Sequence, residues 1–380
     1  MSGTIASPAL SHGLAALLRG EAVLWNALGV TAAEFLEACS EQDLVGLLDK
    51  QLGNLPEDRD WPPDIREGLA RKARAEAARE LLRHREIIVV LEALAGEGVH
   101  PILLKGTPFA YQVYEAPHLR PRCDTDLLVP RAQIEMVRRS LAPRGYCAPL
   151  YCDGELLFCQ FELAKEDEFG VDHVFDFHWK ISTQSMFADL LTYDELSAAA
   201  VPVPTLGSHA RTAGLVHALL LACLHPVMHH RNIERLIWIY DIHLLASGLS
   251  AAEFGRFVDL AVAKQVATIS ARGLALAHAR FATRIPDRVT SHLLAVRYAE
   301  PSASYLQPAR RWNDELMSSM RGLPRWTERV RLLREVVFPG PSYMLKAYGL
   351  RPGWASAVFL PALYFHRGVC GLVKVVAGRK

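Results

Sequence analysis

Two aspartates, Asp124 and Asp126, stand one residue apart, immediately before the apolar run 127–129. If this stretch forms a strand, side chains two residues apart point to the same face, so both carboxylates aim one way. Like charges so close repel each other and raise one pKa unless a cation lies between them. Mg²⁺ takes oxygen ligands, commonly one or two carboxylates together with substrate phosphates. The pair predicts a divalent-cation site, and acids at an exposed strand end are the plain alternative.

A lysine and a glycine, Lys105 and Gly106, follow a short apolar run and precede a helical pattern in "ILLKGTPFA". Glycine lets backbone N–H groups approach a ligand closely, and the N-terminus of a new helix favours an anion. The Lys105 ammonium adds a positive charge suited to phosphate. The order of the residues excludes a Walker A loop. The turn is predicted to bind phosphate, and an ordinary strand–helix turn with an exposed lysine is the alternative.

A third carboxylate, Asp176, lies in "VDHVFDFHWKI" (171–181), which alternates in character. One expected strand face carries Val171, His173, Phe175, Phe177 and Trp179, and the other carries Asp172, Val174, Asp176 and His178. A strand with one packed face and one polar face suits the wall of a cleft. There Asp176 would complete a metal pair or accept a proton from an attacking hydroxyl. An edge strand with solvated acids is the alternative.

Helices and a small sheet must position these side chains. Helical patterns cover residues 10–50 and 65–97, and Gly96 and Gly98 are expected to end the second. Short strand and helix patterns then alternate, including β-rich runs from "YCAPLYC" (146–152) onward, before helical patterns return. This order predicts an α+β fold, a mixed sheet with helices. Its expected parts are an N-terminal helical region (1–85), an α/β core (86–205) and a C-terminal helical domain (206–380).

Composition bounds the partners and the compartment. The 380 residues carry 42 Lys and Arg against 41 Asp and Glu, a net charge of +1, so nucleic acid is not expected as a partner. The seven cysteines form no C-x-x-C pair. This favours reduced thiols in a cytoplasmic protein over a zinc ribbon. The N-terminus lacks the basic start and long apolar core of a signal peptide.

The most apolar stretch, residues 354–378, lies near the C-terminus. Pro361, His366, Arg367 and Lys374 interrupt it, whereas a membrane span needs about 20 predominantly apolar residues. We predict a buried or amphipathic helix and no transmembrane segment. Peripheral contact of this apolar helix with a membrane is the alternative.

The motifs in the middle of the chain resemble the nucleotidyltransferase superfamily that shares its core with DNA polymerase beta. They follow an uncharacterised nucleotidyltransferase branch with L-L-K-G, a tyrosine, R-P-x-x-D-x-D-L-L-V and a distal D-x-H-W. Here these are residues 103–106, Tyr114, 120–129 and 176–179, and "RLIWIYDIHLL" (235–245) is similar to a later helix of that branch. The resemblance covers about residues 100–180 and implies a minimal nucleotidyltransferase sheet as the core.

The resemblance also implies a reaction, the Mg²⁺-dependent transfer of a nucleoside monophosphate from an NTP to an acceptor hydroxyl. Mn²⁺ is the alternative ion. Asp124 and Asp126 would bind the ion that grips the triphosphate. Asp176 would share the second ion and help to deprotonate the acceptor.

The same resemblance assigns the phosphate side of the site. Lys105 and the Gly106 backbone would hold the β- and γ-phosphates. Arg120 would contact phosphate or brace the loop through the D-x-D carboxylates. His178 would belong to the nucleotide site, in a supporting or structural role rather than as the base. The turn departs from better-known members of the superfamily, which carry glycine–serine or glycine–glycine where this chain has Lys105–Gly106.

Two other functions fit part of the pattern. A D-x-D glycosyltransferase shares the metal logic but explains neither the Lys–Gly turn nor the third aspartate. A nucleotide-binding or partner-binding protein without turnover would keep the fold alone. The acceptor stays open among small molecules, peptides and proteins.

Five histidines fall in one helical region: His217, His225, His229, His230 and His243. His225 and His229 stand four apart, but Pro226 is expected to break or begin a helix between them. The histidines are therefore predicted to make satisfied polar contacts or to line the substrate cleft, rather than to bind zinc. In the same region, Asp241 is expected to pair with Arg231 or Arg235, or to point at the nucleotide.

Overall fold

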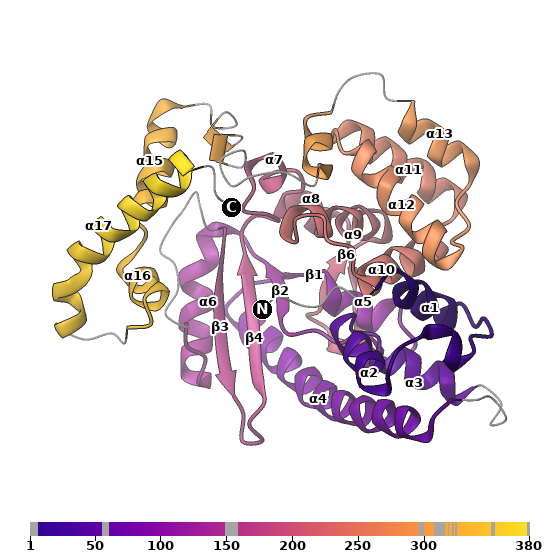
Figure 1. Cartoon of the computed structure of the whole chain (residues 1–380). Coiled ribbons are helices and arrows are strands. Elements are labelled where there is room, and N and C mark those ends of the chain that lie inside the picture. The colour runs from indigo at the N-terminus through magenta and orange to yellow at the C-terminus, as the bar shows by residue number, and fades with distance from the viewer. Residues whose placement is uncertain are drawn as a thin grey trace.

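A computed structural model describes residues 7–54, 61–148, 159–295, 300–307, 316–317, 319–320, 323, 325–350 and 354–377 (Figure 1). The predicted α+β fold is confirmed, because one mixed sheet is flanked by helices from both ends of the chain. The expected boundaries at residues 85 and 205 stay predictions. The sheet itself continues beyond residue 205, to β6. Most of the β-rich run 146–152 lies outside the described residues.

Six strands form the sheet, in the order β3-β4-β2-β1-β6-β5. β2 pairs in parallel with β4 and β1 with β6, and the other neighbouring strands are antiparallel. The strands are β1 (Ile102–Leu104), β2 (Thr125–Leu128), β3 (Gln160–Glu166), β4 (Asp172–His178), β5 (Ala200–Pro202) and β6 (Arg211–Ala213).

The register of the central strands places the chemistry. Asp126 of β2 lies opposite Leu104, the last residue of β1, on one side. On its other side it lies opposite Asp176 of β4. The turn that follows β1 therefore lies beside both carboxylates.

Alternate residues of the central strands enter two separate cores. Leu103, Leu127 and Phe177 are buried with residues of α4 (Pro63–Gly96) and α6 (Ile134–Leu141). Leu104 and Leu128 are buried in a second, larger core built mostly from helices at the two ends of the chain. Asp126 shares the strand face of Leu104 and Leu128, so its side chain points toward this second group of helices.

The second core contains helices that precede the sheet strands in the sequence and helices that follow them. Before the sheet come α1 (Pro8–Leu18), α2 (Ala32–Glu41) and α3 (Val45–Gly53); after it come α9 (Leu215–His229), α10 (Leu236–Ser247), α11 (Ala251–Ala263), α12 (Ala267–Phe281) and α13 (Asp287–Leu294). Short elements connect these parts: α5 (Gly106–Gln112), α7 (Ser185–Ala188), α8 (Tyr193–Ala198), η1 (Trp25–Leu28), η2 (Pro117–Leu119), η3 (Arg131–Gln133), η4 (Ala142–Arg144), η5 (Pro204–Leu206) and η6 (Pro301–Leu306).

The helix expected over 65–97 is confirmed as α4, which ends at Gly96 as predicted. The prediction that Pro226 breaks or begins a helix is wrong, because α9 runs through it. Pro226 lies in the last turn of α9, where the missing N–H removes only one hydrogen bond near the helix end.

The C-terminal part of the chain forms α15 (Trp326–Val337), α16 (Pro341–Ala347) and α17 (Trp354–Ala377), drawn in orange to yellow at one side of Figure 1. Of the two forms expected for the terminal helix, the buried one is wrong. Val358 and Phe365 are 71% and 76% exposed. Within the described residues, no helix has the length and apolar character to cross a membrane.

Candidate functional site

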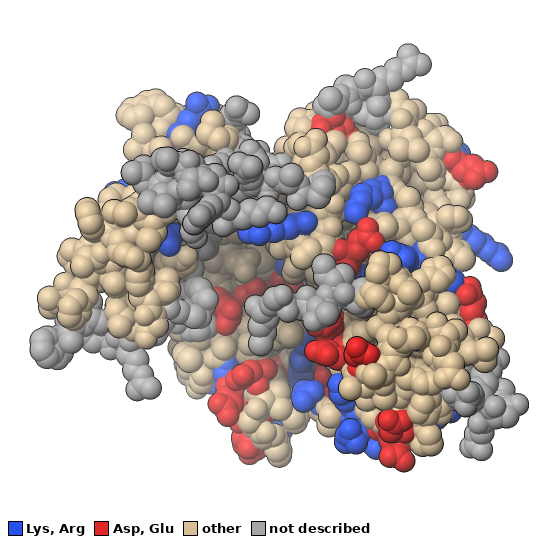
Figure 2. All heavy atoms as spheres, viewed as in Figure 1, with Lys and Arg blue, Asp and Glu red and all other residues tan. Residues whose placement is uncertain are grey.

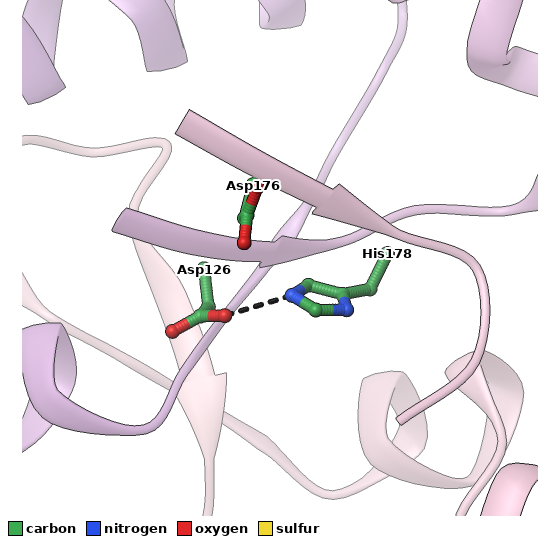
Figure 3. Close-up of side chains that lie close together, drawn as sticks. All are labelled: Asp126, Asp176 and His178. Carbon is green, nitrogen blue, oxygen red and sulfur yellow. Dashed lines mark hydrogen bonds and ion pairs between the residues drawn. The ribbon is translucent and has the colours of Figure 1, made fainter. Parts of the chain in front are cut away.

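Three side chains from β2 and β4 form a candidate metal site. Ligand atoms of Asp126, Asp176 and His178 all lie within 4.8 Å of one another, and Figure 3 shows the three side chains pointing together. In the described parts of the chain this is the one group of three or more His, Cys, Asp or Glu with that geometry. The group follows from the register, because Asp126 lies opposite Asp176 and His178 lies two residues farther along the same face of β4.

Asp126 is the most strongly held carboxylate of the site. Its Oδ1 accepts hydrogen bonds from Lys105 Nζ at 2.6 Å and from His178 Nε2 at 2.7 Å. Nε2 carries the proton because a carboxylate offers only acceptors. Burial disfavours the charged form, but Lys105 and the hydrogen bond from His178 outweigh it and hold the pKa of Asp126 well below its usual range. Both bonds end on Oδ1, and the carboxylate is ionised.

The pKa values of Asp176 and Asp124 are raised, in contrast to that of Asp126. Burial, together with repulsion from Asp126 and Asp124, raises the pKa of Asp176 to about 7. Burial and the charge of Asp126 raise the pKa of Asp124 to about 6. Gln160 Nε2 donates a hydrogen bond to Asp176 Oδ2 at 3.0 Å. Three carboxylates beside one lysine are under-compensated, and a divalent cation with oxygen ligands fits this donor set.

Asp124 lines the same cleft as Asp126 and Asp176 but lies just before β2. It is not one of the three residues whose ligand atoms cluster within 4.8 Å; His178 takes that place. The assignment of Asp124 as a metal ligand stays a prediction.

Lys105 has an unusual backbone conformation, with φ +57° and ψ −131°. A lysine rarely adopts a positive φ, and such strain costs of order 1–3 kcal/mol. Gly106, the first residue of α5, needs no positive φ. A Cβ added at Gly106 would lie 3.5 Å from the guanidinium of Arg120, which is an ordinary contact. The special conformation of the turn therefore falls on the lysine rather than on the glycine.

Arg120 is occupied by an ion pair. Its Nε and Nη2 donate to the Asp241 carboxylate at 2.8 and 2.7 Å, and Tyr114 donates its hydroxyl to Asp241 at 2.8 Å. Arg120 and Asp241 are 6% and 3% exposed. Arg120 thus joins the segment between η2 and β2 to α10, rather than bracing the D-x-D carboxylates.

The expected partners of Asp241 are wrong, because neither Arg231 nor Arg235 pairs with it. Arg235 pairs instead with Asp43 of the N-terminal region at 3.0 Å. Tyr114 and Arg120 each bond directly to Asp241 of α10, across 127 and 121 residues, which no local spacing reveals.

The site opens into a cleft of ≈ 320 Å³ between the central strands of the sheet and the helices α9 and α10. Six of the seven sequence-predicted site residues line it: Lys105, Gly106, Arg120, Asp124, Asp126 and Asp176. The seventh, His178, is 1% exposed and contacts Asp126 from the side. The predicted supporting position of His178 agrees with this arrangement.

The far wall of the cleft carries the histidines. His225, His229 and His230 line it together with Trp238, so the prediction of a cleft wall is confirmed for these three. The His230 ring stacks on Trp238 with centroids 4.2 Å apart. Burial and the nearby Lys105 charge lower the pKa of His229 to about 3 and that of His230 to about 4, so both rings are neutral.

His217 and His243 lie away from the cleft lining. His217 lies near Glu195, and the His243 ring contacts the Thr283 hydroxyl at 2.9 Å. The contact of His243 is the satisfied polar contact that the sequence predicts, whereas Nε2 of His217 is 3.9 Å from Glu195, beyond hydrogen-bond distance.

Sequence reasoning missed Gln160, Asp43 and Arg122, which also line the cleft. The position of Gln160 could have been predicted from the sequence. A hairpin in which Glu166 pairs with Asp172 puts Gln160 opposite His178. Asp43 carried no such signal, since it comes from a helical region far away in sequence.

Basic and acidic side chains intermix on the face shown in Figure 2, in keeping with the net charge of +1.

Comparison with known proteins agrees with the geometry. A family model described as an uncharacterised nucleotidyltransferase matches residues 29–282, two thirds of the chain and all of the cleft residues. A search of curated proteins finds no match. The chain belongs to this uncharacterised nucleotidyltransferase family.

Proposed function

We propose that this protein transfers a nucleoside monophosphate from an NTP to an acceptor hydroxyl, with Mg²⁺ or Mn²⁺ bound by the cleft carboxylates. One observation carries the proposal. Asp126 and Asp176 lie in register on adjacent strands beside Lys105, in an open cleft of a nucleotidyltransferase-family chain.

The carboxylates supply the metal site. Asp126 and Asp176, with Asp124 beside them, would hold the cation through oxygen atoms. Such a cation supplies positive charge to the triphosphate oxygens and to the charge that develops during displacement. The raised pKa values of Asp124 and Asp176 support this role, because they report negative charge that the protein leaves under-compensated.

Asp176 also suits proton transfer. The pKa of Asp176 is about 7 without a metal, and a bound cation would lower it and keep the carboxylate ionised, which is the form that accepts a proton. The acceptor hydroxyl would give its proton to the Asp176 carboxylate as its oxygen bonds to the α-phosphorus. The bond from the α-phosphorus to the oxygen bridging to the β-phosphorus breaks, and pyrophosphate leaves. Gln160 holds the carboxylate in place for this step.

The cationic and buried groups divide the remaining work. Lys105 lies at the cleft with its ammonium bonded to Asp126 and would also contact the β- and γ-phosphates, with the Gly106 N–H beside it. His178 fixes the orientation of Asp126 through its hydrogen bond. We assign Arg120 a positioning role, because its guanidinium is already bound to Asp241.

The test uses NTPs labelled on the α- or the γ-phosphate, incubated with Mg²⁺, the full chain and cell extract. Transfer of the α-label with release of pyrophosphate is expected. Asp126→Asn and Asp176→Asn should abolish it, whereas Asp172→Asn, an exposed acid on the same strand β4, should not.

Three results would overturn the proposal. Transfer of the γ-label would indicate a kinase. NTP binding without pyrophosphate release across a broad acceptor screen would indicate a binding protein. Mn²⁺-dependent hydrolysis of sugar nucleotides without use of NTPs would indicate a glycosyltransferase.

A further inference from the structure

The helix α15 carries an apolar row on its solvent-facing side. Trp326, Val330, Leu333 and Val337 recur at intervals of four, three and four residues. At 3.6 residues per turn this spacing puts all four on one face. Their exposed fractions are 73%, 53%, 39% and 44%, so the row lies open to solvent.

The helix α17 repeats the arrangement. Val358, Ala362, Phe365 and Val369 recur at the same intervals, and all four are exposed. Isolated apolar residues on a surface are common, but an ordered exposed row on each of two contacting helices is typical of an interaction site. We call these eight residues the apolar rows. The helices α15 and α17 are in contact.

Positive charge is concentrated in the same part of the chain. The last 60 residues hold 11 Lys and Arg but 2 Asp and Glu, a net charge of +9, so the preceding 320 residues carry −8. On α15, helical spacing puts Arg331 and Arg334 on one side of the apolar row, and Arg325 and Arg329 on the other. The apolar row therefore has basic borders.

We propose that α15 and α17 bind the surface of an anionic lipid bilayer. The apolar rows would enter the boundary between headgroups and acyl chains, and the arginines would lie among the anionic headgroups. Tryptophan and phenylalanine suit this boundary, because it offers an apolar side and a wet side. The helices would lie along the surface, since no helix in the described residues can cross a membrane.

Other occupants fit the same observations less well. A second copy that packs its own C-terminal helices here would bring a segment of charge +9 against another of the same charge. A nucleic acid would use the arginines but gain nothing from the exposed valines and leucine, which cannot stack on bases. An anionic bilayer uses both the charge and the apolar rows.

The inference is independent of the proposed reaction. The family match ends at residue 282, and none of the cleft residues lies in α15 or α17. Vesicle binding therefore tests the surface without any assumption about catalysis.

The experiment is co-sedimentation of the full chain with vesicles of phosphatidylcholine alone, or with about a third phosphatidylglycerol. We expect the chain to bind the vesicles that contain phosphatidylglycerol and not those of pure phosphatidylcholine. Binding should weaken when salt rises from about 0.1 M to about 0.5 M. Two variants test the two parts of the surface. Replacing Trp326, Val330 and Leu333 with serine, or Arg331 and Arg334 with glutamine, should each weaken binding at least tenfold.

Matched controls remove the same kinds of group elsewhere. Leu81 and Phe169 are 74% and 65% exposed but lie outside the C-terminal helices. Leu81→Ser with Phe169→Ser should leave vesicle binding unchanged, as should Arg79→Gln with Arg256→Gln, at side chains 55% and 63% exposed. Circular dichroism and thermal melting confirm that each variant is folded.

Three results would overturn the inference. The first is no binding to anionic vesicles by the parent chain. The second is binding that survives in both folded α15 variants. The third is self-association in sedimentation velocity that the serine variant abolishes while vesicles bind no chain, which would assign the apolar rows to a second copy.

Discussion

The ammonium Nζ of Lys105 lies 2.6 Å from Oδ1 of Asp126, while the backbone of the same lysine has φ +57°. Glycine would occupy this backbone conformation without strain, but it would bring no charge. Within the described residues, the lysine that pairs with this buried carboxylate thus has a strained backbone. Strain held at a site of this kind is typical of function rather than of stability.

Two variants at this position separate the strain from the charge. Both Lys105→Gly and Lys105→Ala remove the ammonium, but only glycine relieves the positive φ. We expect Lys105→Gly to be more stable than Lys105→Ala by about 1 kcal/mol in urea unfolding. Both should bind NTP at least about tenfold more weakly, because a charge-assisted contact to phosphate is lost. Equal stability of the two variants would contradict the strain, and unchanged NTP affinity would contradict the phosphate contact.

Asp176 should lower the stability of the metal-free protein as pH rises from 6 toward 7.5, against a rise contributed by buried histidines such as His229 and His230, whose pKa values are lowered. The pKa of Asp176 is raised from 3.8 to about 7 on folding, so between these values its carboxyl binds more protons in the folded state than in the unfolded state. The contribution of Asp176 to the unfolding free energy then decreases with pH until the carboxyl is ionised. Asp124, with a pKa of about 6, adds to the fall mainly below this window. The contribution of Asp126, whose pKa is lowered, is complete above about pH 5 and stays constant here.

Urea unfolding of the parent and of Asp176→Asn across this pH range isolates the contribution of Asp176, because the histidines titrate in both proteins. The stability of Asp176→Asn relative to the parent should increase from pH 6 to 7.5, whereas that of Asp172→Asn should stay constant. Saturating Mg²⁺ should remove the contribution of Asp176 from the parent, because a bound cation favours the ionised carboxylate. A difference between the parent and Asp176→Asn that does not change with pH would contradict the raised pKa of Asp176.

The buried pair Arg120–Asp241 should be costly to break from one side. Arg120→Met leaves the Asp241 carboxylate buried with only Tyr114 as a donor, and we expect a loss of about 3–5 kcal/mol. Asp241→Leu should cost a similar amount. The double variant should lose much less than the sum, because no uncompensated charge remains. Urea unfolding of the four proteins gives the coupling energy; additive losses would mean that the two side chains do not depend on each other.

His178 should act through Asp126 rather than on the nucleotide. His178→Phe removes one of two donors to Asp126 Oδ1, so Mn²⁺ affinity should fall about tenfold or more. His178→Gln keeps an N–H donor and should recover part of the affinity. Mn²⁺ binding measured by electron paramagnetic resonance separates this role from a purely structural one. A phenylalanine variant that is folded and binds Mn²⁺ normally would exclude it.

The strand and helix patterns in the sequence predicted several elements of the fold. The 3.6-residue pattern over 65–97 predicts α4, and the alternation over 171–181 predicts which face of β4 is polar. Both are local properties, since one face of each element must be buried. The prediction of a helix break at Pro226 was wrong for a non-local reason. Packing along α9 outweighs the one hydrogen bond that proline removes.

The amino-acid sequence by itself determined the candidate site residues: Lys105, Gly106, Arg120, Asp124, Asp126, Asp176 and His178. Residue type and spacing indicate the aspartates, because like charges two residues apart on a strand must be compensated, and the family resemblance adds Arg120 and His178. Which charges compensate each other was decided only by the tertiary structure. The parallel register of β2 and β4 puts Asp126 with Asp176 and His178, and α10 brings Asp241 to Arg120 across 121 residues. Contacts between elements far apart in sequence depend on how whole faces pack, and no local pattern encodes them.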